Sequence, residues 1–134
     1  ALEVMDENNG TLSYVPESHK LPIFEFYDLN IKAPKFGEQF ESYAEYEEFV
    51  RQLIESKKLK TETLQCKRGH ALIWASNLLH GGIEIKDVSR SRYSHVTHYY
   101  FEGCDKYYSP LFSESWKGEF SEKDLTNKNF YDYE

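Results

Sequence analysis

The chain contains few cysteines, prolines and glycines, and their placement excludes several classes of protein. Its two cysteines, Cys66 and Cys104, lie far apart and form no CxxC pair, which argues against a zinc site or a disulfide-stapled secreted domain. We therefore expect two free thiols in a reducing compartment and a cytoplasmic protein, with a single disulfide as the alternative. Four prolines and seven glycines are too few for a collagen-like or low-complexity chain.

Positive charge and long apolar runs are also scarce. The net charge is −7, and the main basic cluster, Lys57, Lys58 and Lys60, falls at the end of a predicted helix, where it compensates the helix dipole. No nucleic-acid partner is expected, because sustained phosphate contacts need clustered Lys and Arg side chains. No stretch approaches the roughly 20 apolar residues of a membrane span, so no membrane association is expected either.

Aromatic residues, by contrast, are abundant. They make up 16% of the 134 residues and include 11 Tyr and 9 Phe, a load that favours β-rich structure over disorder. A chain of this length can bury one independent core. We therefore predict a single domain over residues 1–134.

Turn and strand signals occupy the first third of the chain. The run Asn8-Asn9-Gly10 predicts a hairpin between two short strands within residues 1–15, because both residue types tolerate positive φ. Pro16 should end the second strand, since proline cannot donate to a ladder. Residues 17–41 are predicted to form a long excursion with one short strand near residues 23–27.

One helix is expected next. Ser42 with Glu45 three residues later fits a capping box that opens the helix, and Lys57 and Lys58 should close its last turn. Apolar residues follow at helical spacing and would form one stripe against a sheet. The stripe consists of Tyr46, Phe49, Val50, Leu53 and Ile54.

The remainder of the chain has strand character. A turn at residues 67–69 precedes the apolar run 70–75, which is typical of a strand buried on both faces, and another strand is expected at residues 92–101. Short strands, Gly, Pro and Asn turns and one peripheral helix together predict an all-β fold with a peripheral helix. The architecture would be an antiparallel β-sandwich or a jelly roll.

Two short patterns carry chemistry. His80 follows the predicted buried strand and precedes two glycines, and imidazole suits iron(II); the alternative is a structural histidine at a strand end. Arg92 and Ser94 lie two apart on a predicted strand, so both would face one side. An inward guanidinium would need an anion, which a carboxylate ligand could supply, whereas the alternative is an outward, solvated arginine.

Taken in order, these blocks resemble the phytanoyl-CoA dioxygenase family. The stretch NGTLSYVPESHK (residues 9–20) resembles the family's NG-x-L-x-x-(V/I)-P-G-S-H-K, and GHALIW (residues 69–74) is similar to the strand before its metal histidine. LHGG (residues 79–82) looks like the histidine motif, and Arg92 matches the family's 2-oxoglutarate arginine in its distance beyond that motif. The resemblance spans roughly residues 1–101.

The resemblance implies a double-stranded β-helix, or jelly roll, that holds iron(II) in a two-His-one-carboxylate triad and uses 2-oxoglutarate to hydroxylate a small-molecule substrate. His80 would be a metal ligand. Arg92 and Ser94 would bind the far carboxylate of 2-oxoglutarate. No residue of this chain is assigned a catalytic role.

Departures from the family's pattern shape the prediction. Glu17 stands where the family usually has Gly, and His70 stands at the place of a frequent Asp. The H-x-D or H-x-E motif that supplies the other two metal ligands is absent, and it is expected upstream of residue 9. Two residues after the five histidines stand Leu21, Leu72, Gly82, Thr97 and Tyr100.

The chain is therefore expected to be the C-terminal part of an incomplete jelly roll, inactive by itself. An incomplete sheet exposes an edge, which favours a homo-oligomer. Two alternatives stay open. One is a non-catalytic module of the same fold that binds a small carboxylate through Arg92. The other is an unrelated β-sandwich that interacts through the Tyr/Phe-rich residues 99–133.

Overall fold

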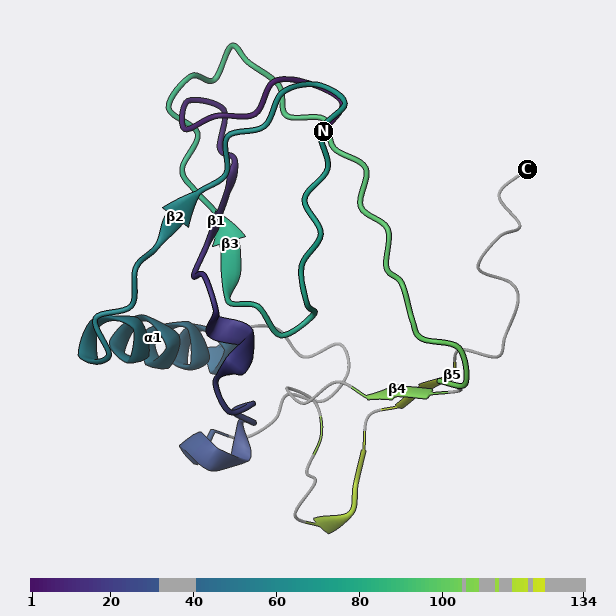
Figure 1. Cartoon of the computed structure of the whole chain (residues 1–134). Coiled ribbons are helices and arrows are strands. Elements are labelled where there is room, and N and C mark those ends of the chain that lie inside the picture. The colour runs from purple at the N-terminus through teal and green to yellow at the C-terminus, as the bar shows by residue number, and fades with distance from the viewer. Residues whose placement is uncertain (32–40, 105, 109–112, 114–116, 121, 125–134) are drawn as a thin grey trace. The chain divides into compact units, whose positions relative to one another are not determined.

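The computed structural model describes residues 1–31, 41–104, 106–108, 113, 117–120 and 122–124 (Figure 1). The backbone divides into two compact units. The first consists of Ala1–Pro22 and Ile54–His98, and the second of Ile23–Leu53 and Tyr99–Glu134. In the described part of the chain no helix is long and apolar enough to cross a membrane.

A three-stranded antiparallel sheet organises the first unit, in the order β2-β1-β3 (Figure 1). Its strands are β1 (Leu12–Tyr14), β2 (Glu62–Thr63) and β3 (His80–Gly82). Tyr14, at the end of the central strand, faces Glu62 on one side and His80 on the other. Residues directly opposite one another in an antiparallel pair project to the same face, so these three side chains form one row across the sheet.

The Asn8-Asn9-Gly10 turn forms, but the predicted hairpin does not. The central strand β1 pairs with β2 and β3, and the residues before the turn make only the isolated bridge between Met5 and Cys66. A type I′ hairpin needs positive φ at two central residues, and here only Gly10 has one, at 72°. Asn9 instead turns its side chain inward and is 1% exposed.

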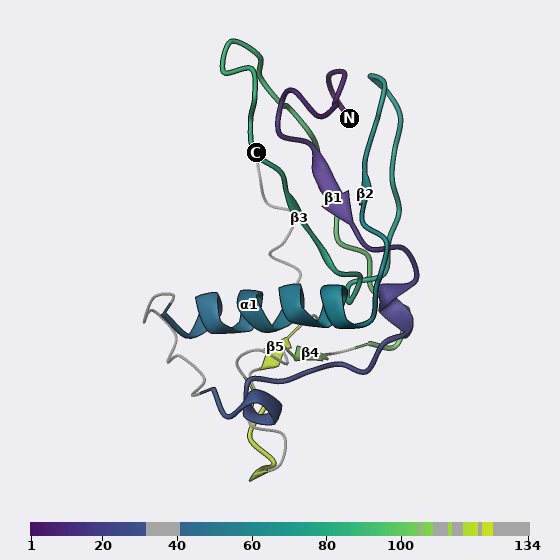
Figure 2. The ribbon, with the colours of Figure 1, turned by 90° about the vertical axis from the view of Figure 1, so that its left-hand side faces the viewer.

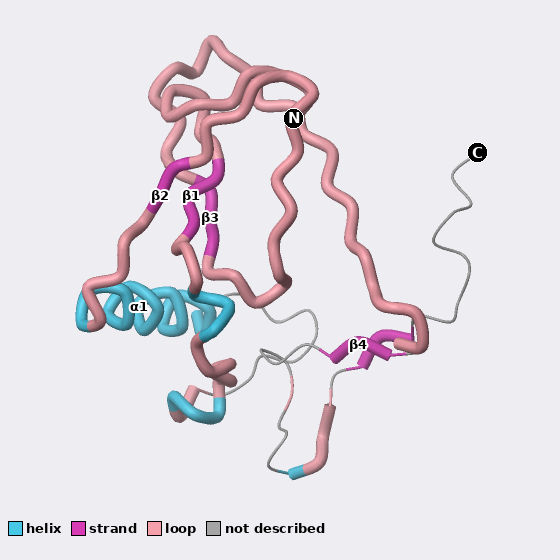
Figure 3. Tube along the Cα trace, viewed as in Figure 1, coloured by secondary structure: helices cyan, strands magenta, loops and turns pink. Residues whose placement is uncertain are grey.

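Two further predicted strands are also absent. The turn before the first is confirmed, with Gly69 at a φ of 86° and the His70 N–H donating to the Lys67 carbonyl at 3.0 Å. Residues 70–75 then run as loop, and Ile73 is 92% exposed (Figure 3). Residues 92–101 are likewise loop. An apolar run becomes a strand only when a neighbour completes its ladder, and no described segment pairs with either run.

The helix α1 spans Glu41–Ser56, one uninterrupted coil in Figure 2. Its predicted stripe is confirmed, because all five stripe residues are half-buried. Phe24 and Phe26 meet this stripe edge to face, with ring centroids 5.0 Å from Phe49 and 5.5 Å from Tyr46. The segment 23–27, predicted as a strand, thus supplies rings to the helix and ends in the 3-10 helix η2 (Tyr27–Leu29).

Both predicted ends of α1 need correction. Ser42 lies inside the first turn and is not the residue before it, so the helix begins before the predicted cap position. The predicted capping box involves the Ser42 side chain, which lies outside the described part of the chain. No basic residue lies in the last turn. The end is made by backbone geometry, with Lys58 at a φ of 52° and the Lys58 and Leu59 N–H groups donating to the carbonyls of Glu55 and Ile54. This is the Schellman arrangement, here with lysine in the left-handed position that glycine usually takes.

Two small elements complete the description. The 3-10 helix η1 (Ser18–Lys20) follows β1 in the first unit. In the second unit β4 (Lys106–Tyr108) pairs antiparallel with β5 (Glu122–Asp124). The described elements are thus small antiparallel sheets and one long helix, in agreement with a sheet-rich chain carrying a helix. Much of the predicted Tyr/Phe-rich segment 99–133 lies outside the described residues.

Candidate functional site

His80 opens β3, and its ring is held in one orientation. Its Nδ1 atom lies 2.7 Å from the Leu78 carbonyl oxygen. A carbonyl can only accept, so Nδ1 carries a proton, and in the uncharged ring Nε2 would keep its lone pair. The side chain is exposed. His80 therefore presents the nitrogen that a metal or a proton donor would use.

The loop that carries His80 is braced by the block after β1. Ser18, which is 4% exposed, accepts a hydrogen bond from the Leu79 N–H through its hydroxyl oxygen at 2.8 Å. The Leu79 carbonyl accepts one from the Val15 N–H at 3.0 Å, and the Asn77 side chain donates to the His19 carbonyl at 2.9 Å. The segment after β1, residues 15–19, thus holds the backbone of residues 77–79 that precedes His80.

Glu17 shows why glycine suits this block. Its backbone has φ 64° and ψ 0°, in the left-handed region that costs a residue with a Cβ about 1–2 kcal/mol relative to glycine. Its side chain forms an ion pair with Lys20 at 2.6 Å, but both side chains are well exposed. An exposed pair of this kind stabilises little. The departure from glycine therefore strains the turn without touching His80.

Arg92 reaches the same face of β3 from a distant loop. Its Nη1 atom donates to the Gly10 carbonyl. A Cβ built on Gly82 would lie 3.8 Å from this Nη1 atom. Because residues two apart on a strand project to one side, the guanidinium lies on the side of β3 from which His80 projects. The structure therefore brings His80 and Arg92 to one face.

The structure does not place Ser94 on the same strand face as Arg92, as the sequence predicted. The expectation that Arg92 and Ser94 face the same way assumed a strand, and residues 92–98 form none. Ser94 is exposed and makes no hydrogen bond within the part of the chain that the structure describes. Its role in binding stays a prediction.

Sequence reasoning missed Tyr14 and Glu62, which continue the row from His80 across the sheet. The Tyr14 hydroxyl donates to Glu62 Oε2 at 3.2 Å, and this carboxylate raises the pKa of the phenol. The Lys60 ammonium, 2.7 Å from Glu62, is the main cause of the lowered pKa of that carboxyl, and the Tyr14 hydroxyl lowers it further. The alternation of Leu12 and Tyr14 signalled that they share a face, but the neighbours on β2 and β3 required the fold.

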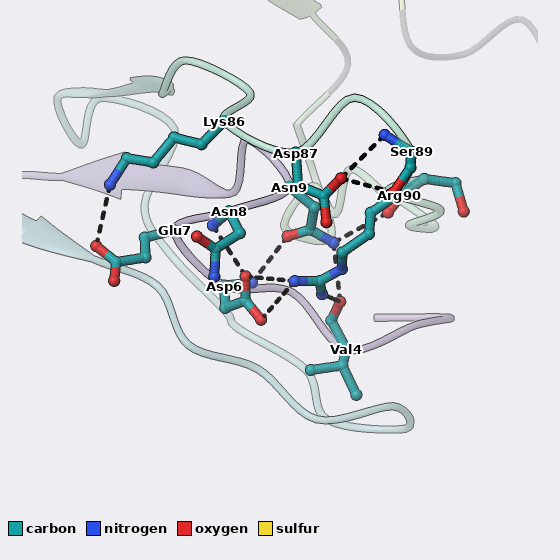
Figure 4. Close-up of polar contacts among 10 residues, drawn as sticks. Val4, Asp6, Glu7, Asn8, Asn9, Lys86, Asp87, Ser89 and Arg90 are labelled. Carbon is teal, nitrogen blue, oxygen red and sulfur yellow. Dashed lines mark hydrogen bonds and ion pairs between the residues drawn. The ribbon is translucent and has the colours of Figure 1, made fainter.

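A second cluster sits at a corner of the same unit (Figure 4). Arg90 Nη1 donates to both carboxylate oxygens of Asp6, at 2.9 and 3.0 Å, and these side chains are 32% and 29% exposed. The pKa of Asp6 is lowered, first by the backbone N–H of Asn8 and then by Arg90. The Asn9 amide donates to the carbonyls of Val4 and Ser91. This corner, made of Asp6, Asn9 and Arg90, leaves its polar groups paired within the chain.

The donor set for a metal is incomplete in the described residues. They contain no group of three His, Cys, Asp or Glu side chains that could hold a metal ion. His80 offers one imidazole ligand, and a facial triad needs two more. The residues present therefore fit one third of an iron site, together with a cation on the same face.

The comparison with known families decides the relationship. The family model for phytanoyl-CoA dioxygenase matches residues 1–87. The chain belongs to the phytanoyl-CoA dioxygenase family. This family falls within the iron(II)/2-oxoglutarate-dependent oxygenases. The match includes His80 and ends before Arg92, which the fold places on the same face of β3 as His80. No curated protein and no solved structure matches the chain.

Proposed function

We propose that this member of the phytanoyl-CoA dioxygenase family is the C-terminal part of an iron(II)/2-oxoglutarate-dependent hydroxylase with a jelly-roll fold. One observation carries the proposal: His80, with Nε2 available, and Arg92, with no carboxylate partner in the described residues, lie on one face of the sheet. An imidazole with an exposed Nε2 edge, on the same face as a guanidinium without a carboxylate partner in the described residues, suits a metal next to an anionic co-substrate.

In this proposal His80 Nε2 is one iron ligand, and Arg92 binds the far carboxylate of 2-oxoglutarate with help from the Ser94 hydroxyl. Iron with 2-oxoglutarate and O₂ would supply the oxidising power for hydroxylating a small molecule. The chain's own residues hold and orient. Leu78 fixes the tautomer of His80, and the Gly10 carbonyl holds one Nη of Arg92 and leaves the remaining N–H donors for a carboxylate.

The other two metal ligands are proposed to come from an H-x-D or H-x-E motif upstream of residue 9, because no histidine of this chain has an acid two residues later. The domain over residues 1–134 would then be one part of a larger jelly roll. A cytoplasmic location, a small-molecule substrate and a homo-oligomer remain predictions attached to this proposal.

An anaerobic titration with iron(II) and 2-oxoglutarate tests the assignment through the visible charge-transfer band of the ternary complex. The band should be absent for this chain, and present for a polypeptide that adds the upstream coding sequence with its H-x-D/E motif. His80→Ala should abolish the band in the longer polypeptide, and Arg92→Met should raise the 2-oxoglutarate concentration needed for it by at least about tenfold. His70→Ala, at an exposed histidine, is the matched control. A strong band from this chain alone would contradict the missing-ligand assignment.

A non-catalytic carboxylate-binding module is the second candidate, favoured by the single metal ligand among the described residues. It predicts that metal-free chain binds succinate through Arg92. Calorimetry with succinate distinguishes the two candidates, because the module binds without metal and the hydroxylase needs iron to chelate the 2-oxo acid. An upstream coding sequence without H-x-D/E would favour the module.

A further inference from the structure

Trp74 packs against the proposed metal ligand. The centroid of its ring lies 5.5 Å from that of the His80 imidazole, with the planes inclined at 59°. A turn between them brings the two rings together: the Leu78 N–H donates to the Ala75 carbonyl at 3.0 Å, so the chain reverses after Trp74. The six-residue separation is thus closed by local geometry.

Trp74 is half-buried although the chain on either side of it is not. Residues 70–75 form no strand, and the neighbours Ile73 and Ala75 are exposed. The His80 imidazole is one surface that the indole ring covers.

An exposed imidazole needs two restraints to present one nitrogen in one direction. The Leu78 carbonyl supplies the first, at Nδ1. A single hydrogen bond to solvent-accessible backbone competes with water, and a ring flip about the Cβ–Cγ bond would exchange the two edges of the imidazole. A bulky ring packed against the imidazole opposes that flip.

We propose that Trp74 is a positioning residue that holds the His80 ring with Nδ1 on the Leu78 carbonyl and Nε2 free for a metal. The inference rests on the proposed function for its purpose, but the restraint itself is a property of the metal-free chain. The indole would not be a metal ligand itself. It acts through His80, as residues around a ligand commonly do.

The tautomer of His80 tests the restraint without any metal. Long-range ¹H–¹⁵N spectra distinguish an imidazole protonated at Nδ1 from one protonated at Nε2. The unaltered chain should show His80 as the Nδ1–H tautomer, with its ring protons displaced by the indole ring current. Trp74→Ala should shift His80 toward the tautomer mixture of a solvated imidazole, and Trp74→Phe should keep the Nδ1–H form.

Trp74→Leu keeps apolar volume and removes the aromatic ring, so it should give an intermediate mixture. This variant and Trp74→Phe keep the test usable if Trp74→Ala fails to fold, which the amide signals of β1 would show. An unchanged Nδ1–H tautomer in folded Trp74→Ala, or in Trp74→Leu if the alanine variant does not fold, would overturn the inference.

In the longer polypeptide that carries the upstream motif, Trp74→Ala should weaken iron(II) binding about tenfold, as loss of an outer-shell partner does. Unchanged iron affinity alongside a changed tautomer would overturn the functional purpose of the restraint. If the His80→Ala variant of the longer polypeptide bound iron(II) as tightly as the unaltered polypeptide, the proposed function would fail. The tautomer result would still decide whether Trp74 restrains the His80 ring.

Discussion

Two arginines only two residues apart lie in opposite electrostatic situations. Arg90 meets Asp6 through two hydrogen bonds and is part of a corner whose polar groups are paired within the chain. Arg92 rests on the Gly10 carbonyl, and no carboxylate in the described residues pairs with it. A carbonyl satisfies one N–H but does not neutralise the charge.

The two arginines thus differ in whether their own chain neutralises them, and we propose a ligand-binding role only for Arg92. The corner joins the start of the chain to the loop at residues 87–91. Its polar groups are already paired within the chain. The face of β3 has a cation, an imidazole with a free nitrogen and little of its own chain to occupy them. Arg90 is therefore paired with an acid of its own chain, whereas Arg92 has no such partner in the described residues.

The corner depends most on its buried amide. Asn9→Ala should lower the free energy of unfolding by about 3 kcal/mol, because the carbonyls of Val4 and Ser91 lose their donor and the Asp6 N–H loses its acceptor. Chemical denaturation measures the change. Asn8→Ala, at the exposed neighbour, should change stability little. Equal effects at both positions would break the view of Asn9 as the clamp.

Exchanging the arginines for methionine tests the comparison directly. Arg90→Met should lower the Tm by a few degrees, because Asp6 loses its countercharge in a half-buried setting. Arg92→Met should lower the Tm less, because it removes only the bond to the Gly10 carbonyl. Its main effect should fall on carboxylate binding. Calorimetric melts compare the two, and the reverse order would refute the division of roles.

The acid range sharpens the same comparison. The pKa of Asp6 lies below its ordinary value of 3.8 in the folded chain, so its stabilisation is present above that value and is lost as the pH falls through the lowered pKa. The Tm difference between the unaltered chain and Arg90→Met should therefore shrink below about pH 3.8. Arg92→Met should show no such change in its difference, since it has no carboxylate partner among the described residues. Melts at a series of acidic pH values check both.

A further effect is expected in the turn that follows β1. Glu17→Gly should raise the Tm by a few degrees, because glycine adopts the left-handed backbone without strain, and the exposed ion pair with Lys20 that it gives up stabilises little. Glu17→Ala is the matched control, since it removes the ion pair and keeps the Cβ. A rise with Glu17→Ala equal to that with Glu17→Gly would place the effect in the side chain and not in the backbone.

Local signals predicted part of this fold well. The apolar stripe of α1, the turn before His70 and the end of β1 before Pro16 each follow from a few neighbouring residues. The strands expected at residues 70–75 and 92–101 failed, since a ladder depends on a partner distant in sequence. The hairpin prediction failed for a related reason. The Asn9 side chain donates hydrogen bonds to the carbonyls of Val4 and Ser91, and an Asn-Gly pair in the sequence does not indicate such distant partners.

The candidate site shows the same limit. Family resemblance singled out His80 and Arg92, and their common face became visible only through the fold. Trp74 was assigned to a buried strand because its neighbours are apolar, whereas the structure sets it against His80. Pattern recognition identifies the residues with distinctive chemistry, and the residues that orient them have no distinctive spacing.

The two glycines after His80 have a consequence of their own. Gly10 must be glycine, because its φ is 72° and a Cβ there would lie 2.5 Å from Ile85 Cγ1. Gly81 and Gly82 meet neither condition: a Cβ on Gly81 has nothing within 4 Å, the nearest atom to one on Gly82 is at an ordinary 3.8 Å, and neither φ is left-handed. Folding of the described chain therefore does not demand glycine at either position. The missing side chain of Gly82 leaves open space next to the Arg92 guanidinium, on the face of β3 from which His80 projects.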